Sequence, residues 1–218
     1  MPTDSPTERL VRKYCKHVFN NALLGLAALG LSGAAAAQTG YTAMPIHNGV
    51  NALKLRGYDA IAVRAWRENF NAHSFDVVTF FVRDGTAGRA QPWSLVPVFR
   101  RSNNGGSGEQ EQLHVTASGG ADCLLHDFRL LLAQGGKPAV LILANRETGA
   151  SYAAEANVRF DYYVLTENTD GTPGYPKLSF RWQKSQPART QYCDVNRAFD
   201  QELHLGTSSG TANVADGP

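Results

Sequence analysis

The sequence predicts a mainly β protein: a single antiparallel β-sandwich-like domain with a C-terminal α-helix, preceded by a cleaved signal peptide. Runs of β-branched and aromatic residues alternate along the chain with clusters of Gly, Pro, Asn and Asp, which is typical of strands joined by turns. Apolar residues recur at helical spacing over residues 195–203, directly after Asp194, a suitable N-cap. The sequence has neither an internal repeat nor a second apolar core. We therefore expect one domain over residues 38–205, folded as two packed layers or one strongly curled sheet.

Residues 1–37 have the three parts of a secretory signal peptide. A basic start precedes an apolar run, residues 22–31, and small residues follow up to Ala37. The run is much shorter than the roughly 20 residues of a stable transmembrane helix, which disfavours the alternative of an N-terminal membrane anchor. We expect cleavage after Ala37, a periplasmic or secreted protein, and no stable membrane insertion afterwards.

Cleavage changes the charge of the chain. It removes four of the 21 basic and two of the 19 acidic residues, which leaves 17 of each. A nucleic-acid partner is disfavoured, because phosphate binding needs a clustered positive surface.

Cys123 and Cys193 are the only cysteines after residue 37. In an oxidising compartment we expect them to form a disulfide, with two free thiols or a metal-binding pair as the alternatives. The bridge closes a loop of about 70 residues and should stabilise the fold by about 4 kcal/mol on the chain-entropy model.

In the remaining chain, turn residues separate several short predicted strands. The expected strands, in order, are residues 53–55, 60–66, 77–82, 93–99, 110–116, 139–144, 159–166 and 177–184. Pro97 confines its strand to an edge or a bulge. Residues 122–132 fit a strand or a helix, and the turn at residues 135–138 favours a hairpin with the strand that follows. We expect residues 38–48 to be a lead-in and residues 206–218, rich in Gly, Ser and Thr, to be disordered.

The strands at residues 60–66 and 77–82 form the expected centre of the fold. In the first, Ile61, Val63 and Ala65 share one face while Arg64 and Trp66 take the other, as in a half-buried strand. The second is β-branched or aromatic throughout, which is typical of a strand covered on both faces.

The connection between these strands is the candidate site, a mixture of polar and aromatic groups suited to a small polar ligand. Its candidate residues are Trp66, Arg67, Glu68, Asn69, Asn71 and His73. The structural alternative is that Asn69 and Asn71 satisfy the turn backbone and that Glu68 pairs with an arginine. For His73 the alternative is a buried, hydrogen-bonded role.

Sequence signatures of catalysis are missing. The one G-x-S-x-G, residues 206–210, lies in the tail without the strand and helix that a nucleophile elbow needs. S-x-x-K, K-T-G and paired metal-ligand histidines do not occur either. We therefore expect no enzyme activity, no cofactor and no metal site.

Four short motifs together resemble a family of exported bacterial proteins. They are Gly49-Val50-Asn51; residues 65–75 (AWRENFNAHSF); Asp122-Cys123 followed by Asp127-Phe128-Arg129; and Tyr192-Cys193-Asp194-Val195. Across most of the chain after residue 37 the sequence is similar to the CarG family of carbapenem self-resistance proteins. The resemblance implies a periplasmic, β-rich protein that protects against a carbapenem without hydrolysing it, and it carries over no binding residues.

Three functions follow from the sequence. The first is an exported, non-catalytic binding or protective protein that confers carbapenem resistance. The second is an envelope protein-interaction module, or an inhibitor of a cell-wall enzyme. The third is an unrecognised hydrolase that uses His73 with Glu68 or an aspartate. The expected partner is a small polar ligand or an envelope protein, and the sequence gives no oligomeric state.

Overall fold

The computed structural model describes residues 40–83, 93–101, 108–120 and 122–206, and the mainly β class and the C-terminal helix are confirmed. The predicted signal peptide and nearly all of the predicted tail lie outside the described residues. In chain order the elements are β1 (Tyr41–Met44), β2 (Gly49–Leu55), β3 (Tyr58–Arg67), β4 (Phe75–Arg83), β5 (Trp93–Val96), β6 (Val98–Arg101), β7 (Glu109–Gln112), β8 (Val115–Gly119), β9 (Leu124–Ala133), β10 (Val140–Arg146), β11 (Ala156–Glu167), β12 (Leu178–Tyr192) and α2 (Val195–Leu203).

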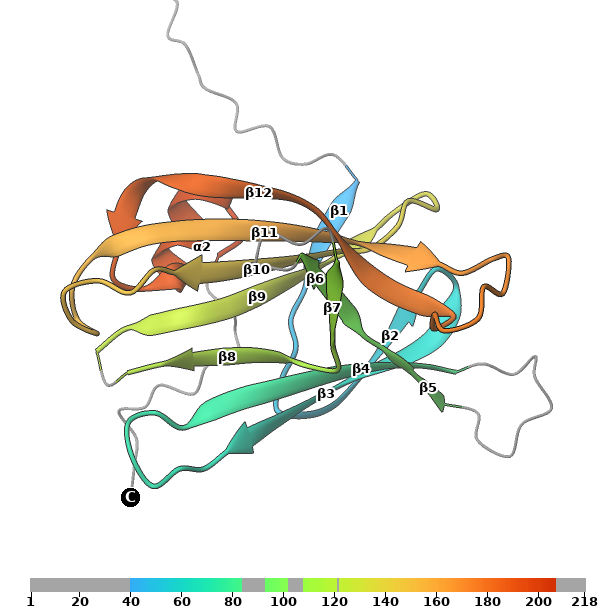
Figure 1. Ribbon diagram of the computed structural model, residues 1–218, viewed down its shortest axis with the longest axis horizontal. Coiled ribbons are helices and arrows are strands. Elements are labelled where there is room, and N and C mark those ends of the chain that lie inside the picture. Colours follow the sequence, from blue (N-terminus) through green and yellow to red (C-terminus); the bar gives the residue numbers. More distant parts are fainter. Residues whose placement is uncertain (1–39, 84–92, 102–107, 121, 207–218) are drawn as a thin grey trace, which may run out of the picture. The chain divides into compact units, whose positions relative to one another are not determined.

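The strands of the described ranges form one sheet in the order β2-β3-β4-β8-β9-β10-β11-β12-β6-β7, with β1 paired to β9 and β5 paired to β4 (Figure 1). Every pairing is antiparallel except that of β12 with β6. Pro97 separates β5 from β6, so the chain leaves β4 and joins β12 within a few residues. Its carbonyl accepts a hydrogen bond from Phe180 N–H at 2.9 Å, which helps to curl the sheet back on itself.

Several predicted connections are confirmed. β2 and β3 form the expected hairpin, and residues 68–74 join β3 to β4. The ambiguous segment at residues 122–132 is strand β9, which pairs with β10 as the hairpin interpretation required. Three expectations need correction. The lead-in contains β1, and the strand expected at residues 177–184 continues to Tyr192. The single strand expected at residues 110–116 is two strands, β7 paired with β6 and β8 paired with β4 and β9.

One face of the sheet encloses the larger apolar core, and the expected orientation of β3 within it was wrong. Ala60, Ala62 and Arg64 point into the protein, whereas Ile61 and Val63 are only half-buried. β4 likewise alternates between fully buried and half-buried residues instead of being covered on both faces.

A buried ion pair explains the inverted face of β3. Arg64 is 1% exposed; its Nη2 donates to Asp76 Oδ2 at 2.6 Å and its Nη1 to the carbonyl of Ile46 at 3.0 Å. The charged head is thus neutralised and hydrogen-bonded inside the sheet, which burial of a charge requires.

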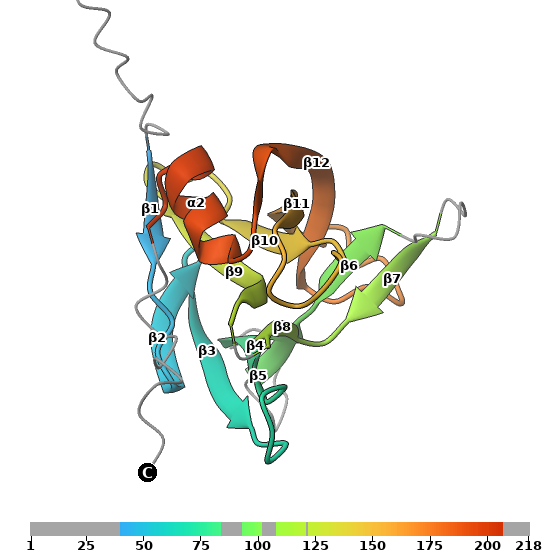
Figure 2. The same ribbon diagram turned by 90° about the vertical axis from the view of Figure 1, so that its left-hand side faces the viewer.

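The other face of β9–β11 is covered by α2, as seen from the side in Figure 2. Val195, Ala198 and Phe199 of the helix are fully buried, and the Phe199 ring packs on Phe160 with centroids 5.4 Å apart. The predicted N-cap is confirmed, because the Asp194 carboxylate accepts from Asn196 N–H at 2.7 Å. In the described part of the chain, no helix combines the length and the apolar character needed to cross a membrane.

Arg129 links the helix to the sheet. Its guanidinium lies 4.2 Å from the centroid of the Phe199 ring and donates to Asn196 Oδ1 at 2.6 Å, Asp127 Oδ2 at 2.8 Å and the carbonyl of Gly206 at 2.7 Å. One cation therefore holds β9, the helix and the chain that leaves the helix.

Candidate functional site

The connection between β3 and β4, residues 68–74, lies at one end of the sheet together with Arg67, the last residue of β3. The β8–β9 turn and the β10–β11 loop lie at the same end, on the left of Figure 1. We call residues 67–74 the elbow.

Glu68 organises the elbow. Its Oε1 accepts hydrogen bonds from Phe70 N–H and from the Ser74 hydroxyl, both at 2.6 Å, and its Oε2 accepts from Trp66 Nε1–H at 3.1 Å. These bonds, that of Ser74 first, then those of Trp66 and Phe70, lower the pKa of the Glu68 carboxyl to about 2. The expected arginine partner is thus replaced by three donors from the elbow and its flank.

The two asparagines of the elbow bind its backbone, as the structural alternative expected. Asn69 Nδ2 donates to the carbonyl of His73 at 2.7 Å, and Asn71 Oδ1 accepts from His73 N–H at 2.9 Å. The Ser74 hydroxyl oxygen also accepts from Asn69 N–H at 2.9 Å. The elbow is therefore hydrogen-bonded from within, and these groups hold a loop rather than face a cavity.

Phe70 occupies the tip of the elbow in an unusual conformation. Its φ is 57°, in the left-handed region that a bulky residue rarely adopts. Its side chain is 95% exposed, so burial of the ring does not compensate for the strain. The hydrogen bond from its backbone N–H to Glu68 holds the backbone in this conformation.

Two more exposed aromatic rings and an imidazole lie in the elbow or against it. Trp66 is 47% exposed, and the His73 ring lies 5.1 Å from that of Tyr152, which is 57% exposed and belongs to the β10–β11 loop. His73 is itself exposed, so the buried role considered for it was wrong. We call Trp66, Phe70, His73 and Tyr152 the elbow surface.

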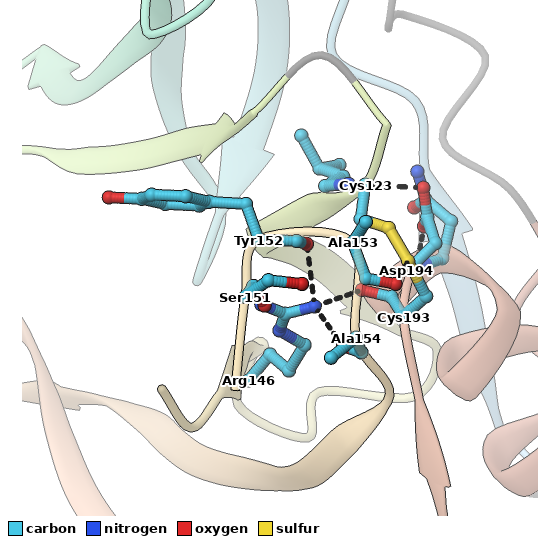
Figure 3. Close-up of a disulfide and its surroundings, with 10 residues drawn as sticks. Cys123, Arg146, Ser151, Tyr152, Ala153, Ala154, Cys193 and Asp194 are labelled. Carbon is cyan, nitrogen blue, oxygen red and sulfur yellow. Dashed lines mark hydrogen bonds between the residues drawn. A yellow bond between two sulfur atoms is a disulfide. The ribbon is translucent and has the colours of Figure 1, made fainter. Parts of the chain in front are cut away.

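Arg146 fixes the loop that carries Tyr152. Its guanidinium is buried and lies 2.6–3.4 Å from the carbonyl oxygens of Tyr152, Ala154 and Cys193, and 3.2 Å from that of Ser151 (Figure 3). The Tyr152 ring projects away from this cluster, as Figure 3 shows. Arg146, at the end of β10, thus fixes the position of Tyr152.

The disulfide lies next to this loop. Cys123 and Cys193 are joined as predicted, with Cα atoms 5.6 Å apart. Asp194 Oδ2 accepts from Leu124 N–H at 3.2 Å, a second tie across the same junction. Gly119 lies so close to the backbone of Cys123 that no Cβ would fit there.

The structure thus brings Glu68, Asn69, Asn71 and His73 together in one loop, and Trp66, near the end of β3, donates to Glu68 from its flank. Arg67, the remaining candidate, stacks over the Phe75 ring at 5.4 Å from its centroid. Tyr152 was missed, because it is about 80 residues from the elbow in sequence and no local pattern marks its approach. Within the described ranges, no three His, Cys, Asp or Glu side chains gather as a metal site would require.

The fold is similar to that seen in the crystal structure of CarG, with a TM-score of 0.53 and 24% sequence identity over 73% of this chain and 94% of CarG. At this identity the likeness shows a CarG-like fold and nothing finer. Neither a family model nor a curated protein sequence matches the chain.

Two of the four motifs that carry the family resemblance meet at one junction. Asp122-Cys123 and Cys193-Asp194 come together at the disulfide, and Arg129 of β9 donates to Asp127 and to Asn196 of the helix. In a third motif, Asn51 donates to the carbonyls of His47 and Ala62 and so fixes the start of β2. These motif residues build the fold; only the fourth, residues 65–75, forms an exposed surface.

Proposed function

We propose that this protein is an exported, non-catalytic binding protein that protects against a carbapenem without hydrolysing it, by contacting a protein of the cell envelope through its elbow surface. The observation that carries the proposal is the display of Phe70, 95% exposed at a strained φ, by a carboxylate that accepts three hydrogen bonds. Exposed aromatic rings on a loop that is already ordered are the usual anchors of protein interfaces, because little freedom is lost on binding.

The carbapenem part of the proposal rests on two supports. The sequence motifs resemble the CarG family, and the fold is similar to that of CarG. The geometry of the elbow favours a protein partner over a small ligand, because the polar side chains expected to face a ligand are bound to the loop itself.

The geometry of the elbow does not support the hypothesis of a hydrolase that uses His73. The Ser74 hydroxyl donates to Glu68, the His73 ring packs beside Tyr152, and the low pKa of Glu68 makes it a poor general base at neutral pH. An inhibitor of a cell-wall enzyme remains a second candidate, since a rigid loop with an aromatic tip also suits insertion into an enzyme cleft.

Three experiments test the proposed function. Purified protein mixed with a carbapenem should leave the absorbance of the antibiotic ring unchanged, and turnover would contradict a non-catalytic role. A strain that lacks the gene should become more sensitive to carbapenems, and an unchanged sensitivity would contradict protection. Capture of one stoichiometric envelope protein, abolished by Phe70→Ala, would identify the partner; if that partner is a cell-wall enzyme that loses activity on binding, the second candidate is correct.

A further inference from the structure

A cavity of about 470 Å³ lies at the opposite end of β3 from the elbow surface, between Tyr58 and the β11–β12 connection. It is open to solvent and is lined by Tyr58, Glu167, Asn168, Thr169, Gly171, Thr172, Pro173, Tyr175 and Lys177. This volume is within the usual range of small-molecule sites.

The floor of the cavity is held by a network of fixed charges. The Tyr58 hydroxyl donates to Glu167 Oε1 at 2.8 Å, and Arg56 Nε lies 3.2 Å from Glu167 Oε2. The Lys177 ammonium lies 4.6 Å from the centroid of the Tyr58 ring. The floor thus carries both a carboxylate, Glu167, and cations, Arg56 and Lys177. It therefore favours neither a cationic nor an anionic ligand strongly.

The rim of the cavity is formed before any ligand arrives. The Asn168 side chain accepts from Thr172 N–H at 2.9 Å and donates to the carbonyls of Thr172 at 3.0 Å and Tyr175 at 3.2 Å. Asn168 N–H also donates to the carbonyl of Lys177 at 2.8 Å, which closes the connection at its base. Binding would therefore cost little ordering of the loop.

Tyr175 gives the rim an aromatic face. Its side chain is 49% exposed, and the Arg181 guanidinium, 4.8 Å from the ring centroid, supports the ring. The two threonines, Glu167 and Lys177 line the same cavity and supply both donors and acceptors. An aromatic ring in a cavity that also holds donors and acceptors matches a sugar ring, which has C–H groups on its faces and hydroxyls at its edge.

We propose that this cavity binds a neutral saccharide through stacking on Tyr175 and hydrogen bonds to Glu167, Lys177 and the loop. No residue of the cavity belongs to the elbow surface. This site therefore goes beyond the proposed function and is tested independently of it.

An NMR titration of the purified, ¹⁵N-labelled protein tests the site. The probes are chitobiose (N-acetylated), cellobiose (not acetylated) and citrate (anionic). Saturable amide shifts confined to residues 56–58 and 167–177, with either disaccharide and not with citrate, are expected. Comparison of the two sugars then distinguishes an N-acetylated wall-type glycan from a plain hexose.

Tyr175→Ala should weaken disaccharide binding roughly tenfold, the loss of one aromatic stacking partner. Tyr152→Ala is the matched control, an exposed tyrosine of the elbow surface, and should bind the sugar as the parent does. The dispersion of the amide spectrum reports whether each variant is folded. An absence of saturable shifts with both sugars, a preference for citrate, or unchanged binding by folded Tyr175→Ala would overturn the proposal.

Discussion

The Ser74 hydroxyl lies 2.6 Å from Glu68 Oε1, the same oxygen that accepts the backbone hydrogen bond of Phe70. One carboxylate oxygen therefore joins the tip of the elbow to the start of β4. Because Ser74 is buried while Phe70 is exposed, the shape of the exposed tip depends on a contact made beneath it.

Ser74→Ala should loosen the tip without unfolding the protein. The variant removes one of the three donors to Glu68 and the acceptor of Asn69 N–H, so the Phe70 amide should exchange its hydrogen several-fold faster. Amide exchange followed by NMR measures this. Thr166→Ala is the control, because that hydroxyl donates only to Val164 of its own strand; equal exchange at Phe70 in both variants would contradict the role given to Ser74.

The order of the elbow should persist to strongly acidic pH. Because its hydrogen bonds lower the pKa of Glu68 from an ordinary 4.5 to about 2, the ionised carboxylate stabilises the folded state fully above pH 4.5. That contribution falls as the pH drops through this range and is lost near pH 2. The amide shift of Phe70 should titrate with a midpoint near 2, and Glu68→Gln should abolish the transition. A midpoint near 4.5 would show that the three hydrogen bonds do not form in solution.

Removing one partner of the Arg64–Asp76 ion pair should destabilise the protein strongly, whereas replacing both partners by apolar residues should change the free energy of unfolding little. Arg64→Met leaves the Asp76 carboxylate buried without its cation, so the free energy of unfolding should fall by about 3–5 kcal/mol. The double variant Arg64→Met/Asp76→Leu removes both charges and should recover most of that loss. Urea denaturation of the three proteins measures both values. A single variant as stable as the parent would refute the buried pair.

Loss of the disulfide should destabilise the whole fold. The double variant Cys123→Ser/Cys193→Ser should lose about 4 kcal/mol, because the unfolded chain is no longer closed into a loop of about 70 residues. Thermal unfolding with and without reductant measures the difference, and reductant should not affect the double variant. Alkylation of the native protein without reductant should label neither cysteine; two labelled thiols would refute the bridge.

Much of the fold could be predicted because its signals are local. The apolar alternation and turn residues of β2, β3 and β4 lie within 35 consecutive residues, and Asp194 caps the helix that begins at its neighbour. These elements depend on short-range spacing, which a sequence displays directly.

The features that were predicted wrongly or missed depend on residues that are far apart in the chain. Alternation put Arg64 on the face of its strand opposite the apolar residues, and only the approach of Asp76 and Ile46 makes its burial possible. The strand predicted to end at residue 184 continues as β12 past Pro187, because β6 pairs only with Phe180 and Arg181 and leaves the later residues at an edge. The contact of Tyr152 with His73 and the cavity near Tyr175 arise only from tertiary structure.

The most direct measurement of the central claim is complementation of a strain that lacks the gene, scored by its sensitivity to a carbapenem. Phe70→Ala should fold normally and fail to restore protection, whereas Val50→Ala, which trims an exposed apolar residue of β2, should restore it fully. Full protection by Phe70→Ala, at an expression level equal to that of the parent, would contradict a protective role for the elbow surface.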